Sequence, residues 1–408
     1  AILDNIFYGK SCCTIKFKVE IKMQNLRILG KGKTALALKK RFPDAILYDD
    51  NDLESFDKNS NDLTIVSPGM PPHNKLVLAS KNIISDYDLF YDEMPFTIWI
   101  SGTNGKTTTT QMSQYLLEKF DSCYGGNIGV PLSGLNKDKK IWILETSSFT
   151  LHYTKKAKPN IYILLPITED HITWHGSFDE YKKAKLKPLE LMNETDIAII
   201  PALYKDFKTS AHTIYYNSSD DLCNHFKIDK SKIKFNEPFL LDAIMAMISR
   251  KIIFGDVDYD LINSYKIDKH KVEEFRDSKN RLWIDDSKAT NYDATINALV
   301  PYKDKNIHII IGGDDKGASL KPLFENIKEL DIVIYAIGSN TQRVLNYCEE
   351  FKISCVKCEY LEQAVKNIDK NLKENSIGIL SPAAASLDQF KSYAHRGDEF
   401  KKFVKSLS

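Results

Sequence analysis

The fold is decided by the stretch Ser101-Gly102-Thr103-Asn104-Gly105-Lys106-Thr107-Thr108. It follows a strand-like apolar run, Phe96–Ile100, and precedes residues whose apolar side chains recur every four positions, as on one face of a helix. In a strand, glycine loop and helix of this kind, backbone N–H groups surround a phosphate and the helix N-terminus adds positive potential. The stretch therefore predicts a phosphate loop, with Lys106 at the β and γ phosphates of a nucleotide and Thr107 on Mg²⁺.

Two other interpretations of this loop stay open. The general phosphate-loop pattern begins with glycine where this chain has Ile100, so a glycine turn without a ligand would also fit. A GTPase switch would need an NKxD motif to recognise guanine. The nearest string, Asn136-Lys137-Asp138-Lys139, lacks the final aspartate.

Strand-like runs alternate with helix-like stretches along most of the chain, which predicts parallel sheets covered by helices. The runs are Phe96–Ile100, Ile141–Leu144, Ile161–Leu165, Ile197–Ile200, Ile307–Ile311, Ile332–Ile337 and Ile377–Leu380. Polar stretches near residues 91–95 and 264–269 suggest two boundaries. We expect an α/β protein of three domains: a Rossmann-like domain at 1–92, a P-loop ATPase-like domain at 93–268 and a Rossmann-like domain at 269–408.

The composition of the chain indicates which kinds of partner and compartment to expect. The 408 residues carry a net charge of +1, so there is no electrostatic argument for nucleic acid or an anionic membrane as partner. No apolar run is long enough to span a bilayer. Seven cysteines at irregular spacings suit a reducing cytoplasm, and we expect a cytoplasmic monomer with small-molecule partners. Cys355-x-x-Cys358 could be half of a zinc or redox site, but its flanks alternate like a strand before a helix.

The N-terminal segment does not read like the usual beginning of a protein. Residue 1 is alanine, and Met23 stands just before the first clear strand. Lysines and adjacent cysteines interrupt the apolar residues, so the segment is a poor secretory signal. We therefore expect residues 1–22 to lie upstream of the true start. Peptides from this segment in a mass spectrum of the native protein would contradict that expectation.

The loop SGTNGKTT resembles the loops of Mur ligases and folylpolyglutamate synthases. Further segments from about Leu26 to Phe400 agree in the same order, most closely with the Mur branch that adds D-glutamate to UDP-N-acetylmuramoyl-L-alanine. The resemblance implies a three-domain enzyme that uses ATP and Mg²⁺ and makes an amide bond through an acyl phosphate. The implied ATP-binding residues are Gly102, Thr103, Asn104, Gly105, Lys106, Thr107, Thr108, Lys271 and Asp286, and Lys106 is also implied in catalysis.

Three more residues acquire roles in magnesium binding from the resemblance. Glu145 ends a buried strand and resembles the ligand beside Thr107, although a simple loop acid would also fit. His171 resembles the ligand of a second magnesium ion; His171-x-x-x-His175 could alternatively be a zinc pair. Lys185 lies in a basic run that reads as a solvated helix, but the matching lysine of the family is carbamylated. His171 and Lys185 are thereby implied in catalysis.

The C-terminal third carries the implied amino-acid site. The string DDSKATN resembles a family signature in which Asp286 binds nucleotide, Lys288 the transferring phosphate and Thr290 the amino acid. A strand end followed by a helix cap is the plain alternative. Lys316, after two glycines, resembles the lysine that binds a D-glutamate carboxylate. The string SPAAASLDQF, with Ser386, most favours D-glutamate, and Tyr393 stands where phenylalanine is usual.

The N-terminal glycines read as GxGxxA between a strand and a helix, with Asp49 and Asp50 after the next strand. Alone, this pattern would suggest an NAD(P) site. The resemblance implies a UDP-substrate site instead, and its residues are Gly30, Gly32, Ser67, Pro68, Gly69 and Asn127.

One departure from the family stands out. An asparagine motif that often precedes the third domain is replaced here by Pro238–Ala243, so adenine and ribose contacts there are open. Lys271 stands where arginine is usual and lacks the planar guanidinium fork of arginine.

Two rival functions remain: a ligase for another amino acid, or a nucleotide-binding regulator without ligase activity.

Overall fold

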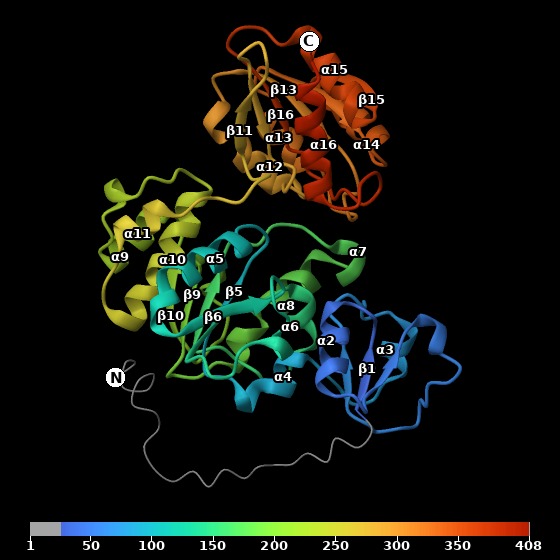
Figure 1. Cartoon of the computed structure of the whole chain (residues 1–408), viewed down its shortest axis with the longest axis vertical. Coiled ribbons are helices and arrows are strands. Elements are labelled where there is room, and N and C mark those ends of the chain that lie inside the picture. The colour runs from blue at the N-terminus through green and yellow to red at the C-terminus, as the bar shows by residue number, and fades with distance from the viewer. Residues whose placement is uncertain (1–25, 408) are drawn as a thin grey trace. The chain divides into compact units, whose positions relative to one another are not determined.

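The computed structural model describes residues 26–407 (Figure 1). These residues form two compact units, one of 26–167 with 174–265 and the other of 168–173 with 266–407. The expectation about residues 1–22 lies outside the described residues.

A small parallel sheet begins the first unit. Its strands lie in the order β2-β1-β3-β4. The elements are β1 (Arg27–Leu29), α2 (Lys33–Arg41), β2 (Ile46–Tyr48), β3 (Thr64–Val66), α3 (Lys75–Ala79), β4 (Ile83–Ile84) and α4 (Asp86–Phe90). As predicted, the GxGxxA glycines connect a strand to a helix.

A six-stranded parallel sheet forms the rest of the first unit, in the order β10-β9-β8-β5-β7-β6. Its strands are β5 (Phe96–Ser101), β6 (Ser122–Gly126), β7 (Ile141–Glu145), β8 (Ile161–Leu164), β9 (Ile197–Pro201) and β10 (His212–Tyr216). The helices are α5 (Lys106–Leu117), α6 (Ser148–Tyr153), α8 (Phe178–Leu191), α9 (Ser219–Phe226), α10 (Phe239–Phe254) and α11 (Tyr259–Ser264). Side chains of α4, α6 and α8 share one core with the sheet, while α5 packs against β5, β7 and α10.

The second unit contains another six-stranded sheet, in the order β11-β12-β16-β13-β14-β15. Its strands are β11 (Glu273–Arg276), β12 (Leu282–Asp285), β13 (Asn306–Ile311), β14 (Ile332–Ile337), β15 (Ser354–Glu359) and β16 (Ser376–Leu380). One face is covered by α12 (Tyr292–Leu299), α13 (Lys321–Ile327) and α14 (Thr341–Phe351). The other face is covered by α15 (Leu361–Asn371) and α16 (Tyr393–Lys405).

The predicted fold class is confirmed. Each predicted strand is present with ends that differ by one residue at most, and each predicted domain contains one of the three sheets; the domain limits themselves stay predictions. The expectation of parallel strands is wrong for β11, which pairs antiparallel with β12. The reason is local: the chain reverses through Asp277–Arg281 in a hairpin, which needs no crossover helix.

The two cysteines of the Cys355-x-x-Cys358 motif lie on opposite faces of the sheet. Cys355 packs against the core under α12–α14, whereas Cys358 belongs to the core under α15 and α16. Alternation along β15 separates the thiols, because neighbouring positions of a strand point to opposite faces. The predicted strand before a helix is confirmed, and the pair forms no joint zinc or dithiol site.

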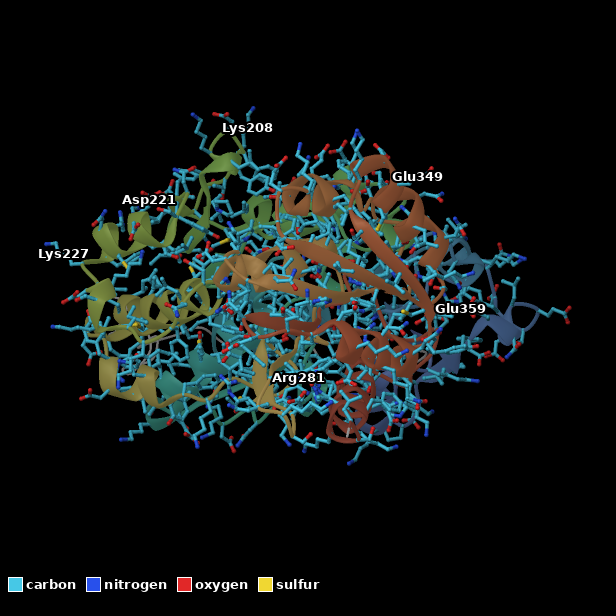
Figure 2. The ribbon with its side chains drawn as sticks, turned by 90° about the horizontal axis from the view of Figure 1, so that it is seen from above. Lys208, Asp221, Lys227, Arg281, Glu349 and Glu359 are labelled. Atoms are coloured by element: carbon cyan, nitrogen blue, oxygen red, sulfur yellow. The ribbon has the colours of Figure 1, made fainter. Side chains whose placement is uncertain are left out.

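Charged side chains of both signs lie at the surface of each unit. Figure 2 labels Lys208, Asp221, Lys227, Arg281, Glu349 and Glu359. Within residues 26–407, no helix combines the length and the apolar character that crossing a bilayer requires.

Candidate functional site

The glycine loop of the first unit connects β5 to α5, as the sequence predicted. Gly105 precedes the helix in the left-handed conformation, with φ of +80°. Gly102 has φ of +141°, and a Cβ there would lie 2.5 Å from the Cβ of Leu165. Both positions therefore need glycine, for backbone conformation and for space. The loop presents the N-terminus of a twelve-residue helix, where backbone N–H groups attract anions.

Two lysines converge on one backbone oxygen of this loop. Lys106 Nζ donates to the carbonyl oxygens of Gly102, at 3.0 Å, and Thr103, at 2.7 Å. Lys185 Nζ, from α8, donates to the same Gly102 oxygen at 2.6 Å. The Lys185 side chain is buried, so the prediction of a solvated basic helix is wrong at this position. The Lys106 ammonium group and the helix N-terminus contribute the positive potential that a polyphosphate needs.

Glu145 gathers two other predicted residues. It ends β7 and is 2% exposed. Its Oε2 accepts from Thr107 Oγ1 at 2.8 Å, and its Oε1 accepts from Asn127 Nδ2 at 2.5 Å. A hydroxyl and a carboxylate side by side are the hard oxygen ligands that Mg²⁺ prefers. The donor set therefore fits magnesium, and Asn127, predicted at the UDP substrate, joins this group.

A residue that the sequence analysis left without a role lies under the loop. Asp242 of α10 is buried, and its Oδ1 accepts from Thr109 Oγ1 at 2.9 Å. A Cβ on Gly105 would collide with the same oxygen. The sequence does mark Asp242 as unusual, because it is a lone acid within an apolar helical run. The run does not indicate which residues the Asp242 side chain contacts. Other loop residues are fixed similarly: Thr103 Oγ1 lies 3.0 Å from Tyr181 Oη, and Thr108 is buried on α5.

The predicted UDP residues of the small sheet, which exclude Asn127, lie in two turns that contact each other. Gly30 has φ of +96°, and a Cβ there would lie 2.9 Å from Ser67 Cβ. A Cβ on Gly32 would lie 3.1 Å from Ser67 Oγ. The close approach brings the turn after β1 to the turn that continues into Pro68 and Gly69. The open space around Gly69 leaves this edge accessible to a ligand.

His171 belongs to the second unit, whereas Thr107, Glu145 and Lys185 belong to the first. Its backbone lies in the left-handed region, with φ of +55°, and its Nε2 lies 3.6 Å from Asp170 Oδ2. Among residues 26–407, the zinc alternative with His175 forms no metal-capable cluster of three ligands.

Lys316, the residue implied in amino-acid binding, is paired with a carboxylate. Its Nζ donates to Asp170 Oδ1 at 2.9 Å, and both side chains are largely buried. Burial alone would raise the pKa of Asp170, but the charges of Lys316 and His171 outweigh burial and lower it. The segment 168–173 is therefore fixed to the second unit, and Thr173 N also donates to Lys316 O.

The loops of Lys316 and Ser386 are joined by an isolated antiparallel bridge. Asp314 N donates to Ala385 O at 3.0 Å, and Ala385 N donates to Asp314 O at 2.7 Å. Ser386 itself is buried and begins a turn whose backbone N–H groups donate to its carbonyl. The structure thus brings together the two loops that the sequence assigned to D-glutamate.

Asp286 and Lys288 lie after β12. Asp286 is buried, which raises its pKa to about 8, although Ser381 Oγ donates to its Oδ2 at 2.6 Å. Lys288 Nζ lies 4.1 Å from the ring centre of Tyr393, a cation–π contact between two predicted residues. Thr290 follows, half-buried, just before α12, and Lys271 Nζ pairs with Asp268 at 3.1 Å.

Arg396 of α16 is a second residue that the sequence analysis missed. It is 1% exposed, and its guanidinium donates to the carbonyl oxygens of Ser287, Ala384 and Ala385. It therefore ties the loop of Lys288 to the loop of Ser386. An arginine in an amphipathic C-terminal helix gives no sequence signal of such a role.

Known proteins resemble this chain over nearly its whole length. The Mur ligase middle domain family matches residues 100–231. A UDP-N-acetylmuramoylalanine–D-glutamate ligase of Campylobacter jejuni (strain RM1221) is 50% identical over 400 residues, which cover 94% of this chain and 100% of that protein. The ligase of the same name from Helicobacter pylori (strain ATCC 700392 / 26695) is 45% identical, over 93% of this chain and 99% of its own. The chain belongs to the Mur ligase family.

Family membership confirms the resemblance and the predicted class of enzyme: this Mur ligase is an ATP-dependent amino-acid ligase. The fold agrees with solved structures. MurF ligase from Thermotoga maritima, in complex with ADP, covers 93% of either chain at 16% identity with a TM-score of 0.58. At that identity the likeness supports the fold alone, so the roles of individual residues in this Mur ligase stay predictions.

Proposed function

We propose that this Mur ligase joins D-glutamate to UDP-N-acetylmuramoyl-L-alanine with cleavage of ATP to ADP and phosphate, a step of peptidoglycan precursor synthesis. The observation that carries the proposal is the phosphate loop, where Lys106 and Lys185 meet at the Gly102 carbonyl and Thr107 meets the Glu145 carboxylate. The names of its relatives at 45% and 50% identity support the choice of substrates.

The reaction requires activation of a carboxylate, because amide formation from a free acid is uphill in water. An oxygen of the UDP-N-acetylmuramoyl-L-alanine carboxylate attacks the γ-phosphorus of ATP, and ADP leaves. Lys106 and Lys288 stabilise charge on the transferring phosphoryl group. The D-glutamate amine then attacks the carbonyl carbon of the acyl phosphate, a proton is lost from nitrogen, and phosphate leaves with one oxygen of the original carboxylate.

We assign the other predicted residues the roles that the family resemblance implies. Thr107 and Glu145 would hold Mg²⁺, with His171 as the ligand of a second ion; the metal supplies charge neutralisation at the phosphates. Gly30, Gly32, Ser67, Pro68, Gly69 and Asn127 would bind the UDP substrate. Thr290, Lys316, Ser386 and Tyr393 would bind D-glutamate, and Lys271 and Asp286 would contact the nucleotide.

We also propose that Lys185 carries a carbamate, which would place an anion beside the magnesium site. Its nitrogen, which donates to Gly102 O, would keep one hydrogen for that bond after carbamylation. Incubation with ¹³C-bicarbonate should give a carbamate signal that is absent from Lys185→Met.

We expect the enzyme to act as a cytoplasmic monomer, so light scattering should report the mass of one chain, 46.6 kDa.

An amino-acid panel tests the main proposal. The purified protein receives ATP, Mg²⁺ and UDP-N-acetylmuramoyl-L-alanine, with D-glutamate, L-glutamate, L-alanine, L-lysine or diaminopimelate. ADP release and a product with the mass of the D-glutamyl adduct should appear only with D-glutamate. Activity with a different amino acid would make it a sibling ligase, and ADP release that needs no amino acid would favour a nucleotide-binding regulator.

A further inference from the structure

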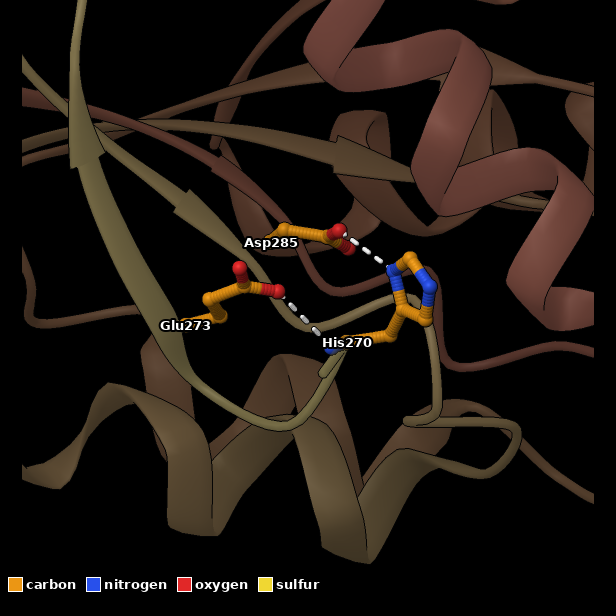
Figure 3. Close-up of side chains that lie close together, drawn as sticks. All are labelled: His270, Glu273 and Asp285. Carbon is orange, nitrogen blue, oxygen red and sulfur yellow. Dashed lines mark hydrogen bonds and ion pairs between the residues drawn. The ribbon is translucent and has the colours of Figure 1, made fainter. Parts of the chain in front are cut away.

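His270, Glu273 and Asp285 form a compact cluster of titratable side chains shortly after residue 266 of the second unit (Figure 3), and Lys401 completes it. His270 Nδ1 lies 2.6 Å from Asp285 Oδ2, and Glu273 Oε2 accepts from the His270 backbone N–H at 3.0 Å. Lys401 of α16 adds its ammonium, 2.9 Å from Glu273 Oε2 and 3.5 Å from Asp285 Oδ2. Asp285 is fully buried and His270 is 6% exposed, so the interaction of these two side chains is little screened by solvent ions.

The cluster could be mistaken for a metal site. One ligand atom each of His270, Glu273 and Asp285 lies within 4.8 Å of the others. The Lys401 ammonium, however, already contacts both carboxylates and supplies the positive charge that a cation would bring. We therefore interpret the group as an internal charge cluster.

The cluster holds a strained turn. His270 has φ of +65° and Val272 has φ of +48°, and neither is glycine. The left-handed region is unfavourable for side chains, most of all for a β-branched residue such as valine. Such conformations persist only where surrounding contacts over-determine them, and they concentrate at functional sites.

The other side of the turn is bonded to the loop of Lys288. The His270 carbonyl accepts from Lys288 N at 3.0 Å, and Val272 N donates to Asp286 Oδ1 at 3.2 Å. The strained turn therefore lies between the charge cluster and the two residues predicted to act on the nucleotide and its phosphate.

Helix α16 contacts this arrangement at three points on one face. Tyr393, Gly397 and Lys401 are spaced four residues apart, so they lie along one side of the helix. The Tyr393 ring holds Lys288 Nζ, and Lys401 holds the carboxylates. At Gly397 a Cβ would collide with His270 Nδ1, so the imidazole lies directly against the helix backbone.

We propose that the cluster of His270, Glu273, Asp285 and Lys401 positions Lys288: it clamps the strained turn and α16 together, so that the Lys288 backbone and ammonium are fixed for phosphoryl transfer. The inference rests on the proposed function, in which Lys288 acts on the transferring phosphate. Lys401 is a positioning residue, because its described ion pairs are with Glu273 and Asp285, and the turn and α16 carry its effect to Lys288.

The test compares Lys401→Met with Lys402→Met in the full-length enzyme. Lys402 is the next residue of α16, lies at the surface and pairs only with Glu399 among the described ion pairs. A displacement of about 1 Å at a catalytic group can lower a rate about 100-fold. We expect Lys401→Met to lower kcat for ligation at least about 10-fold, with KM for UDP-N-acetylmuramoyl-L-alanine within about 2-fold. Lys402→Met should match the wild type, and Lys401→Arg should restore most of kcat.

A folded Lys401→Met variant that keeps the wild-type kcat and shows only a lower melting temperature would overturn the inference. If that variant does not fold, Asp285→Asn replaces it, since the amide oxygen can still accept the bond from Ser287 N while the charge is removed. Wild-type kcat in Asp285→Asn would then overturn the inference. Absence of ligation in the wild type and in Lys402→Met would instead refute the proposed function.

Discussion

The two units hold their buried and half-buried lysines in different ways. In the first unit, Lys106 and Lys185 reach the same backbone carbonyl oxygen, that of Gly102. In the second unit, Lys316 and Lys401 are held by carboxylates.

The difference shows how each unit would meet an anion. The first unit concentrates positive charge at a helix N-terminus, which suits a ligand as negatively charged as a nucleoside triphosphate. The second unit balances its charges internally, so an amino-acid carboxylate that bound Lys316, as we propose, would have to share or replace its Asp170 partner. Binding there should be weaker and more selective, since each new contact displaces an existing one.

The largest expected effect is at the phosphate loop. Lys106→Ala removes the ammonium group of the phosphate loop and should lower kcat for ligation at least about 100-fold, because charge stabilisation of phosphoryl transfer is lost. The melting temperature, measured beside kcat, separates the loss of charge from a loss of the two hydrogen bonds to loop carbonyls. Lys119→Ala, exposed just beyond α5, is the control and should keep full activity. Substantial turnover by Lys106→Ala would contradict the account of the first unit.

An effect of intermediate size, on the KM for D-glutamate, is expected when Lys316 is replaced. Lys316→Met should raise KM for D-glutamate about 10-fold or more, because a hydrogen bond to a charged group contributes about 1.5–3 kcal/mol. KM for ATP should be unchanged, which separates the two units. Lys321→Met, an exposed lysine five residues further along, is the matched control. An equal rise in both KM values would show that Lys316 acts through general stability.

The smallest effect concerns the protonation of Asp286, whose pKa is raised by burial from its ordinary value of 3.8 to about 8. Between these values the unfolded chain has lost a proton that the folded chain keeps, so this group lowers stability as pH rises through that window. The melting temperature of Asp286→Asn relative to the wild type should therefore increase from pH 5 to pH 8. An exposed acid, Asp304→Asn, should show no such trend. If the difference in melting temperature between Asp286→Asn and the wild type did not change with pH, the interpretation of Asp286 as a buried neutral carboxyl would be contradicted.

Much of the fold was predictable, because buried parallel strands read as continuous apolar runs. The glycine loop and Glu145 were predictable for a related reason: each follows a strand, where ligands bind in open sheets. The antiparallel β11, with the sequence EEFR, lacked that apolar signal. Asp242, Arg396 and Lys401 were missed because their roles depend on long-range contacts, and a single charged residue on a helix shows no partner in the sequence.

The most direct test of the central claim follows an isotope. UDP-N-acetylmuramoyl-L-alanine labelled with ¹⁸O in both carboxylate oxygens is incubated with ATP, Mg²⁺, D-glutamate and the enzyme. An acyl phosphate requires that one labelled oxygen passes to inorganic phosphate for each amide bond formed, and mass spectrometry should find that ratio. Formation of the D-glutamyl product with unlabelled phosphate would contradict the account.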